Sequence, residues 1–245
     1  MSDSDDRMAE SLCSMAMIGC LASGVLVLGL ACTIAPAHVQ AAQESTDLQT
    51  GLAEDFSDGI DAWRKQRLDR RLTEYRIIDI DGNSVLEAAS HNAAAALLMP
   101  VDRHSISQGR LRWRWRVMTS LTENLRETEK DGDDYAARVF VLFGDAEFGE
   151  GTRALAYAWA GHVPVGSRYP NPYTSEVSTI VLRSGNQHAG EWMIEDRDIM
   201  ADYARAFGEP PPELAAIALL VDTDDTGGTA MAWFDDIELL VALAP

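Results

Sequence analysis

The stretch at residues 109–117, GRLRWRWRV, alternates between apolar and basic side chains without a break. The apolar residues fall on one side and the arginines on the other: Leu111, Trp113, Trp115 and Val117 against Arg110, Arg112, Arg114 and Arg116. A period of two is typical of a β-strand with two different faces. Because two Trp side chains bury a large apolar area, the sequence predicts a sheet packed against a second layer. The arginine face must then meet carboxylates, a ligand or water.

The composition favours a folded, strongly acidic protein. The chain has 245 residues, of which 47% are hydrophobic, which argues against disorder and provides enough length for a sizeable core. Its 39 acidic and 20 basic residues give a formal net charge of −19. This charge disfavours nucleic acid as a partner and favours solubility, a cation or a cationic partner. The alternative is that the acidic surface is simply solvated.

The N-terminus has the pattern of a targeting segment. Residues 15–34 carry no charge, Pro36 follows them, and the tripeptide VQA at 39–41 has small residues at the −3 and −1 positions of an export cleavage site. We therefore predict that residues 1–41 are a signal peptide and that the protein is periplasmic or secreted. A run of about 20 apolar residues also spans a bilayer, so an uncleaved N-terminal membrane anchor is the alternative. The membrane is expected as a partner only in that case.

Residues 42–51 form a polar lead-in, and residues 52–245 are predicted to fold as a single domain. Strand patterns recur every ten to fifteen residues with turn signals between them, which indicates an all-β, antiparallel, jelly-roll-like β-sandwich. One short helix is expected near residues 198–207, where Asp198 caps its start and Gly208 ends it. All the cysteines lie in the leader, so the domain has neither a disulfide nor a thiolate nucleophile.

Seven segments of the chain, in order, are LRWRWRV, DGDDYAARVFVLF, ALAYAWA, NPYTSEVSTIVLRSG, WMIEDRDIMADYARAFG, ALLVDTDDT and AWFDDIEL. Together they resemble an uncharacterised family of exported bacterial proteins, the domain of unknown function numbered 3047, over most of residues 52–240. This resemblance implies an exported β-sandwich and brings no established reaction. More loosely, EDFSDG at one end and WFDDIEL at the other are similar to the two ends of carbohydrate-binding jelly rolls.

The first group of residues with chemical potential is acidic. Asp222, Asp224 and Asp225 lie in VDTDDTGG, whose spacing imitates part of a calcium loop between two helices. Position 12 of that loop would be Trp233 instead of the bidentate Glu, and the flanking segments are strands, so this motif is rejected. The remaining alternatives are a hairpin loop rich in turn residues and a different cage of oxygen ligands.

The second group surrounds an arginine in an apolar strand. Arg138 interrupts YAARVFVLF, and a buried charge in such a run needs a partner. Asp133 or Asp134, just before the strand, or another carboxylate is expected to supply it. Cross-strand ion pairing on a solvated face would account for the other arginines. The functional alternative is a cleft that holds an anionic ligand, such as a uronic acid, with one or two arginines.

The third group is aromatic and polar, and surrounds a loop rich in Gly and Pro. It consists of Tyr157, Trp159, Arg168, Asn171 and Tyr173. Flat aromatic faces with amide and guanidinium donors suit sugar rings, so Tyr157, Trp159, Asn171 and Tyr173 are candidate ligand-binding residues. The alternative for Tyr157 and Trp159 is the core, where aromatic residues of strands are more often found. Alanines alternate with both, at positions 154–160, and this all-Ala face would let another layer approach closely.

Signatures of catalysis are mostly absent from the sequence. It has no Gly-x-Ser-x-Gly elbow, phosphate-binding loop or dinucleotide fingerprint, and no cofactor is required. Paired carboxylates for glycoside hydrolysis remain an alternative, with Glu147, Glu150 and Glu176 as candidates.

A structural calcium ion is also possible where the chain ends meet. In a jelly roll the first and last strands often lie together, which would join Asp55 to Asp236. In the last strand, Trp233, Asp235, Ile237 and Leu239 form the better core face, so Asp236 is predicted to point outward. The alternative is that Asp55 and Asp236 are separate surface carboxylates.

The function that these observations favour is non-catalytic binding of a glycan or another ligand of the cell envelope. A glycan-active hydrolase or lyase that uses paired carboxylates is the second hypothesis. A structural or partner-binding envelope protein is the third.

Overall fold

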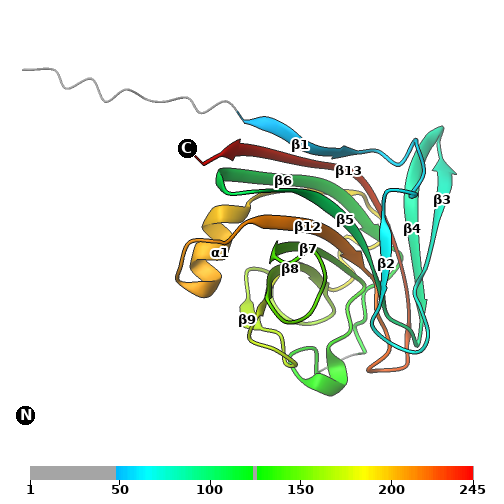
Figure 1. Cartoon of the computed structure of the whole chain (residues 1–245). Coiled ribbons are helices and arrows are strands. Elements are labelled where there is room, and N and C mark those ends of the chain that lie inside the picture. The colour runs from blue at the N-terminus through cyan, green and yellow to red at the C-terminus, as the bar shows by residue number, and fades with distance from the viewer. Residues whose placement is uncertain (1–47, 124–125, 245) are drawn as a thin grey trace, which may run out of the picture. The chain divides into compact units, whose positions relative to one another are not determined.

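The structure is a computed structural model that describes residues 48–123 and 126–244 (Figure 1). The predicted signal peptide, residues 1–41, lies outside the described residues, as does most of the polar lead-in. Within the described residues, no helix combines the length and the apolar character needed to cross a membrane.

The fold consists of two β-sheets. The six-stranded sheet has the order β11-β6-β13-β4-β3, and β1 also pairs with β13. Its strands are β1 (Gln49–Glu54), β3 (Glu74–Ile80), β4 (Asn83–His91), β6 (Ile106–Val117), β11 (Met193–Asp198) and β13 (Thr229–Leu243). The pairing of the first and last strands brings the two ends of this domain together, as a jelly roll requires.

The seven-stranded sheet has the order β2-β5-β12-β7-β8-β10-β9. Its strands are β2 (Arg64–Arg67), β5 (Ala95–His104), β7 (Ala137–Gly144), β8 (Thr152–Ala160), β9 (Arg168–Pro170), β10 (Val177–Ser184) and β12 (Leu214–Leu220). Every pairing is antiparallel except that of β8 with β10, which is parallel. The predicted jelly-roll-like sandwich is confirmed, with this one parallel pair as a departure from purely antiparallel order.

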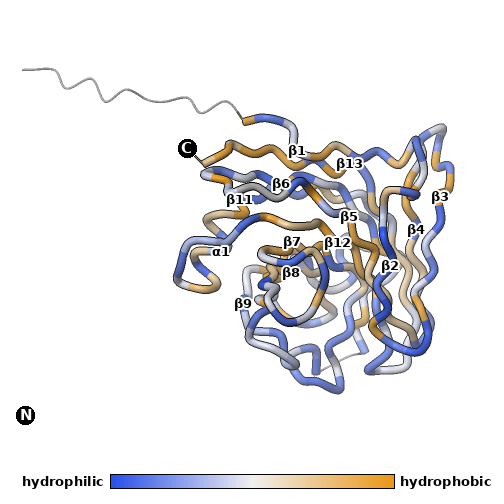
Figure 2. Tube along the Cα trace, in the orientation of Figure 1, coloured by the Kyte–Doolittle hydropathy of each residue, from blue (hydrophilic) through white to orange (hydrophobic). Residues whose placement is uncertain are grey.

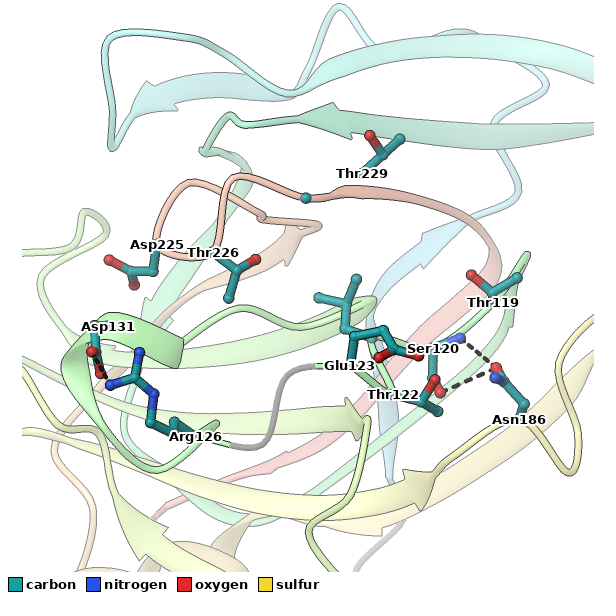
Figure 3. Close-up of a pocket in the computed structure, with 12 residues that line it drawn as sticks. Thr119, Ser120, Thr122, Glu123, Arg126, Asp131, Asn186, Asp225, Thr226 and Thr229 are labelled. Carbon is teal, nitrogen blue, oxygen red and sulfur yellow. Dashed lines mark hydrogen bonds and ion pairs between the residues drawn. The ribbon is translucent and has the colours of Figure 1, made fainter.

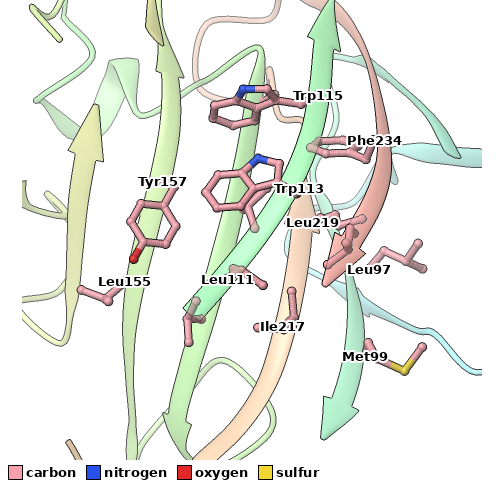
Figure 4. Packing of buried hydrophobic residues seen from close by; sticks show 14 of the residues in the cluster. Leu97, Met99, Leu111, Trp113, Trp115, Leu155, Tyr157, Ile217, Leu219 and Phe234 are labelled. Carbon is pink, nitrogen blue, oxygen red and sulfur yellow. The ribbon is translucent and has the colours of Figure 1, made fainter. Parts of the chain in front are cut away.

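The two-faced strand predicted at residues 109–117 is β6, and its apolar face lies in the core. Trp113 and Trp115 are buried and meet aromatic rings of the opposite sheet, as Figure 4 shows for Trp113 and Tyr157. The ring centroids of Trp113 and Tyr157 are 5.3 Å apart, and those of Trp115 and Trp159 are 5.8 Å apart. Figure 2 shows apolar residues gathered in the strands and polar residues in many of the connections.

The arginines of β6 lie on the outer face, where most meet carboxylates. Arg110 Nε donates to Asp196 Oδ1 at 2.6 Å, and Arg114 pairs with the buried Asp235. Arg116 instead lies over the ring of Trp233, 4.9 Å from its centroid. Cross-strand pairing on the outer face is therefore the arrangement adopted by this row of arginines.

The predicted helix is also confirmed, as α1 (Ile199–Phe207). The Asp198 side chain accepts a hydrogen bond from the N–H of Ala201 at 2.9 Å, and Gly208 ends the helix in the left-handed conformation at φ 75°. Asp202 fixes the helix to the core because its buried carboxylate accepts from Tyr157 Oη at 2.9 Å and from Arg197. A second short element, η1 (Lys130–Gly132), is a 3-10 turn.

The predicted faces of the last strand were partly wrong, because β13 contains a bulge. Asp236 has φ 48°, and the register with β6 shifts between Asp235 and Glu238. The extra residue reverses the alternation, so Phe234 lies in the core while Trp233 and Asp235 lie on the outer face. Asp236 points outward, as predicted.

Candidate functional site

The outer face of the seven-stranded sheet is apolar and covered. Its buried residues are Ala96, Leu98, Phe140, Leu142, Ala154, Ala156, Ala216, Ala218 and Leu220. Residues 145–151, the β7–β8 connection, which we call the strap, cover part of this face with Ala146 and Phe148. Phe148 of the strap packs edge-on against Phe140, with ring centroids 5.0 Å apart.

The strap reaches β2, which two other strands separate from β7. Arg64 Nη1 lies 2.9 Å from Glu147 Oε1, and the Gln66 side chain bonds both polar backbone groups of Phe148. Since β5 and β12 separate β2 from β7, the strap crosses their outer faces. The alanines of this face in β5 and β12, Ala96, Ala216 and Ala218, leave room for it. Ala154 and Ala156 of β8 are fully buried, but the close approach of another layer to the all-Ala face of β8 stays a prediction.

A pocket of about 400 Å³ lies at one end of this covered face. Its apolar wall includes Phe140, Phe148 and Leu220. Its polar lining consists of Asp133, Arg138, Asn171, Tyr173, Thr174, Asp222, Asp224 and Asp225. Four of the predicted ligand-binding residues, namely Asp133, Arg138, Asn171 and Tyr173, therefore meet here. An apolar wall with a few convergent polar groups is characteristic of a ligand site.

Arg138 is the buried cation of the pocket. It is 3% exposed, and its guanidinium lies between two carboxylates: Nη1 is 3.2 Å from Asp133 Oδ1, and Nη2 bonds Asp222. Burial by itself would lower the pKa of Arg138, but Asp222 and Asp133 raise it, so the guanidinium stays charged. The predicted buried ion pair is confirmed for Asp133, while Asp222 is a second partner that sequence reasoning missed.

The mouth of the pocket is formed by Asn171 and Tyr173. Asn171 Nδ2 donates to Asp133 Oδ2 at 2.6 Å, which anchors the loop after β9 to the Arg138 cluster. Tyr173 is 54% exposed, and its hydroxyl lies 2.6 Å from both Asp225 Oδ1 and the carbonyl oxygen of Lys130. This hydroxyl joins three loops and holds the Tyr173 ring at the opening.

Two acidic segments that are distant in sequence come together beside the pocket. Carboxylate oxygens of Asp134, Asp222 and Asp224 lie within 4.8 Å of one another, an arrangement that can offer oxygen ligands to a hard cation. Two of the three carboxylates already form hydrogen bonds with other groups of the protein. Asp134 accepts from Thr226 N at 2.7 Å, and Asp222 bonds Arg138. Burial, together with the neighbouring charges, raises the pKa of Asp224 to about 6.

The other two aromatic candidates lie in the core. Tyr157 and Trp159 are 0% and 1% exposed, because the alternation of β8 turns them toward the six-stranded sheet. Neither ring is available to stack on a ligand, so the alternative interpretation, a place in the core, is the correct one. Of the three aromatic candidates, Tyr173 alone lines the pocket.

The candidate catalytic carboxylates do not meet in this pocket. Glu147 lies in the strap and pairs with Arg64, whereas Glu176 accepts from Arg153 Nε at 2.7 Å. Each therefore has an arginine partner of its own, and neither lines the pocket.

The two residues predicted to hold calcium lie near the junction of the first and last strands. The register pairs Glu54 with Ile237, their immediate neighbours. Asp55 accepts from Ser57 Oγ at 2.6 Å, and Asp236 Oδ2 lies 2.9 Å from Arg114 Nε. Calcium at Asp55 and Asp236 stays a prediction, which thermal unfolding in chelator and in calcium would test.

The fold is a jelly-roll-like β-sandwich, and a pocket lies on the outer face of one of its sheets. The chain belongs to the family described as "Protein of unknown function (DUF3047)", whose profile matches residues 61–238. The resemblance drawn from the sequence is therefore confirmed. No curated protein matches the sequence significantly.

Solved structures similar to this chain include carbohydrate-binding modules. The family 11 module of cellulase Lic26A-Cel5E from Clostridium thermocellum has a TM-score of 0.44 and 9% identity, covering 81% of this chain and 98% of that one. TmCBM61 in complex with β-1,4-galactotriose has a TM-score of 0.39 and 10% identity, covering 78% and 97%. The K1 cleaved adhesin domain of Lys-gingipain from Porphyromonas gingivalis has a TM-score of 0.42 and 13% identity, covering 80% and 99%.

Proposed function

We propose that the protein is a non-catalytic binding protein that holds a neutral glycan in the pocket beside the strap. The observation that carries this proposal is the exposed ring of Tyr173 at the mouth, next to Asn171 and Asp225. Sugar rings pack their C–H faces on aromatic rings, and their hydroxyls donate to carboxylates and bond amides. Phe140 and Phe148 add an apolar wall for the rest of the sugar.

The charge of the pocket favours neutral sugars over uronic acids. The Arg138 guanidinium is already engaged by Asp133 and Asp222, so it does not offer a free cation to an anionic ligand. Asp224 and Asp225 add negative charge to the lining. A carboxylate on the ligand would therefore meet like charges. A uronic acid held by one or two arginines, the functional alternative from the sequence, is therefore disfavoured in this pocket.

Isothermal titration calorimetry of the full chain with cello-, laminari- and galacto-oligosaccharides tests the proposal. Tyr173→Ala is expected to weaken binding by about fivefold or more, because truncating an aromatic side chain that the ligand covers typically costs above about 1 kcal/mol. Ile194→Ala is the matched control, since Ile194 is 69% exposed on β11 of the other sheet. The absence of binding to all three series would refute a neutral glycan as the ligand.

Hydrolysis of the bound glycan is a second candidate, favoured by Asp224. A carboxyl group with a pKa of about 6 can act as a general acid near neutral pH when an ionised carboxylate lies close by. Asp222 and Asp134 lie within reach of Asp224. If the protein is a hydrolase, chromatography will detect shortened products, and Asp224→Asn will abolish them while glycan binding remains. Intact oligosaccharides after long incubation with the native protein would support binding alone.

Export to the periplasm or the cell exterior completes the proposal. It rests on the uncharged run at residues 15–34 and on the small residues before Ala42. Mass spectrometry of the native protein is expected to find Ala42 at the N-terminus. An intact Met1 in the membrane fraction would instead indicate an anchor.

A further inference from the structure

A second, larger pocket adjoins the first. Its volume is about 1100 Å³, and Asp225 belongs to the lining of both pockets. Figure 3 shows Asp225 and Asp131 at one end of this second pocket and Thr119 and Asn186 at the other. The second pocket therefore begins where the first one ends and leads away from it.

The lining of the second pocket is rich in uncharged polar groups. Hydroxyl and amide side chains come from Thr119, Ser120, Thr122, Asn186, Thr226 and Thr229. The Arg126 guanidinium pairs with the Asp131 carboxylate, so these two charges compensate each other, and the remaining charged residues of the lining, Glu123 and Asp225, are both acidic. Hydroxyls and amides both donate and accept hydrogen bonds, which matches the hydroxyls of neutral sugars, and the acidic residues disfavour an anionic ligand.

The junction between the pockets is held in place by the protein itself. The Asp134 carboxylate accepts from the backbone N–H of Asp225 at 3.2 Å and of Thr226 at 2.7 Å. Tyr173 Oη lies 2.6 Å from Asp225 Oδ1 on the side of the first pocket. A loop fixed in this way presents Asp225 toward both pockets at once, as a shared contact for neighbouring units of one ligand.

We propose that the two pockets form one continuous binding track and that the ligand is an extended chain of neutral hexose units. This inference rests on the proposed glycan-binding function and specifies its substrate class. The first pocket falls within the range of about 300–1,000 Å³ that is usual for a small-molecule site, but the second alone exceeds it. One sugar unit stacks on Tyr173, and following units pass Asp225 toward Asn186.

The test compares ligand lengths in calorimetric titrations of the full chain. Cello-, laminari- and galacto-oligosaccharides of two and six units serve as probes, and the six-unit form of the series that binds is expected to bind about tenfold tighter. The double variant Thr119→Val, Thr122→Val removes two hydroxyls of the second pocket at nearly constant volume. In this variant the ratio of six-unit to two-unit affinity should fall close to one. Thr128→Val is the control, because this exposed threonine lines neither pocket.

The outcomes separate this inference from the proposed function. Equal affinity for two and six units overturns the track but leaves glycan binding at Tyr173 intact. A double variant that keeps the full length preference also overturns the track, provided that its melting temperature matches that of the native protein. No binding to any series refutes the glycan-binding function itself.

Discussion

The side-chain amide of Gln66 holds the backbone of Phe148 at both of its polar groups. Gln66 Oε1 accepts from the Phe148 N–H at 3.0 Å, and Gln66 Nε2 donates to the Phe148 carbonyl oxygen at 3.1 Å. The two residues are 82 positions apart in the chain, and Phe148 lies in the strap whereas Gln66 lies in β2. This pair closes the strap over the alanine-rich face and places the Phe148 ring in the wall of the pocket.

Gln66→Ala is therefore expected to release the strap. Each hydrogen bond contributes about 0.5–1.5 kcal/mol, so losing two should raise amide hydrogen exchange at residues 145–151 several-fold without unfolding the sandwich. Hydrogen exchange followed by mass spectrometry measures this directly. Gln108→Ala, on the exposed side of β6, should leave the exchange of the strap as it is. Unchanged exchange in Gln66→Ala would show that the other contacts of the strap hold it on the sheet without Gln66.

Arg138→Met is expected to destabilise the domain strongly. Removing one partner of a buried ion pair typically costs about 3–5 kcal/mol, because Asp133 and Asp222 would keep buried charges without compensation. Arg112→Met is the matched control. Arg112 is half exposed on β6, 3.4 Å from Asp196, and such surface pairs contribute about 0–1 kcal/mol. Equal, small losses in urea unfolding would contradict a structural role for the Arg138 cluster.

Asp224→Asn is expected to change how stability depends on pH. The folded-state pKa of about 6 exceeds the ordinary value of 3.8, so between these values the folded state binds a proton that the unfolded state releases. The free energy of unfolding contributed by Asp224 therefore falls as the pH rises from about 4 to about 6. The variant should be more stable than the native protein at pH 7. Its melting temperature should also change less with pH between about pH 4 and pH 6.

Melting curves from pH 4 to pH 8 measure both effects. Asp58→Asn, at an exposed position of the first turn, provides a control for the loss of one negative charge from an acidic protein. If Asp58→Asn raised the melting temperature at pH 7 as much as Asp224→Asn did, the effect would reflect net charge instead of the pocket.

Local periodicity was sufficient to predict most of the fold. The strand at residues 109–117 needs only its alternation to show that one face is apolar, and the helix at 198–207 carries its own cap and stop. A carboxylate partner for Arg138 was predictable, because a buried positive charge needs a negative partner. Asp133 could be named as this partner because it lies only five residues from Arg138 in the chain.

The remainder depends on contacts between distant residues, which no local pattern specifies. Asp222 is 84 residues from Arg138, so its role as the second carboxylate appears only once β7 and β12 are paired. Tyr157 shows the same limit. The alternation of residues in β8 is equally compatible with either face of the strand pointing outward. Only the packing of Tyr157 against Trp113 across the sandwich shows that the Tyr157 side chain lies in the core. The strap was missed because Gln66 carries no sequence signal for a partner.

The bulge in β13 leads to the last prediction. Asp236 has φ 48°, a conformation that Asp, Asn and Gly tolerate and that β-branched residues strongly disfavour. Asp236→Val should therefore destabilise the domain by about 1–2 kcal/mol. Asp236→Gly should be nearly neutral, since Arg114 still has Asp235 as a partner. Glu238→Val introduces the same valine side chain at a regular position of the strand and should lower the free energy of unfolding less than Asp236→Val does. Urea unfolding compares the three variants, and equal losses for Val at both positions would show that the backbone conformation of Asp236 carries no strain.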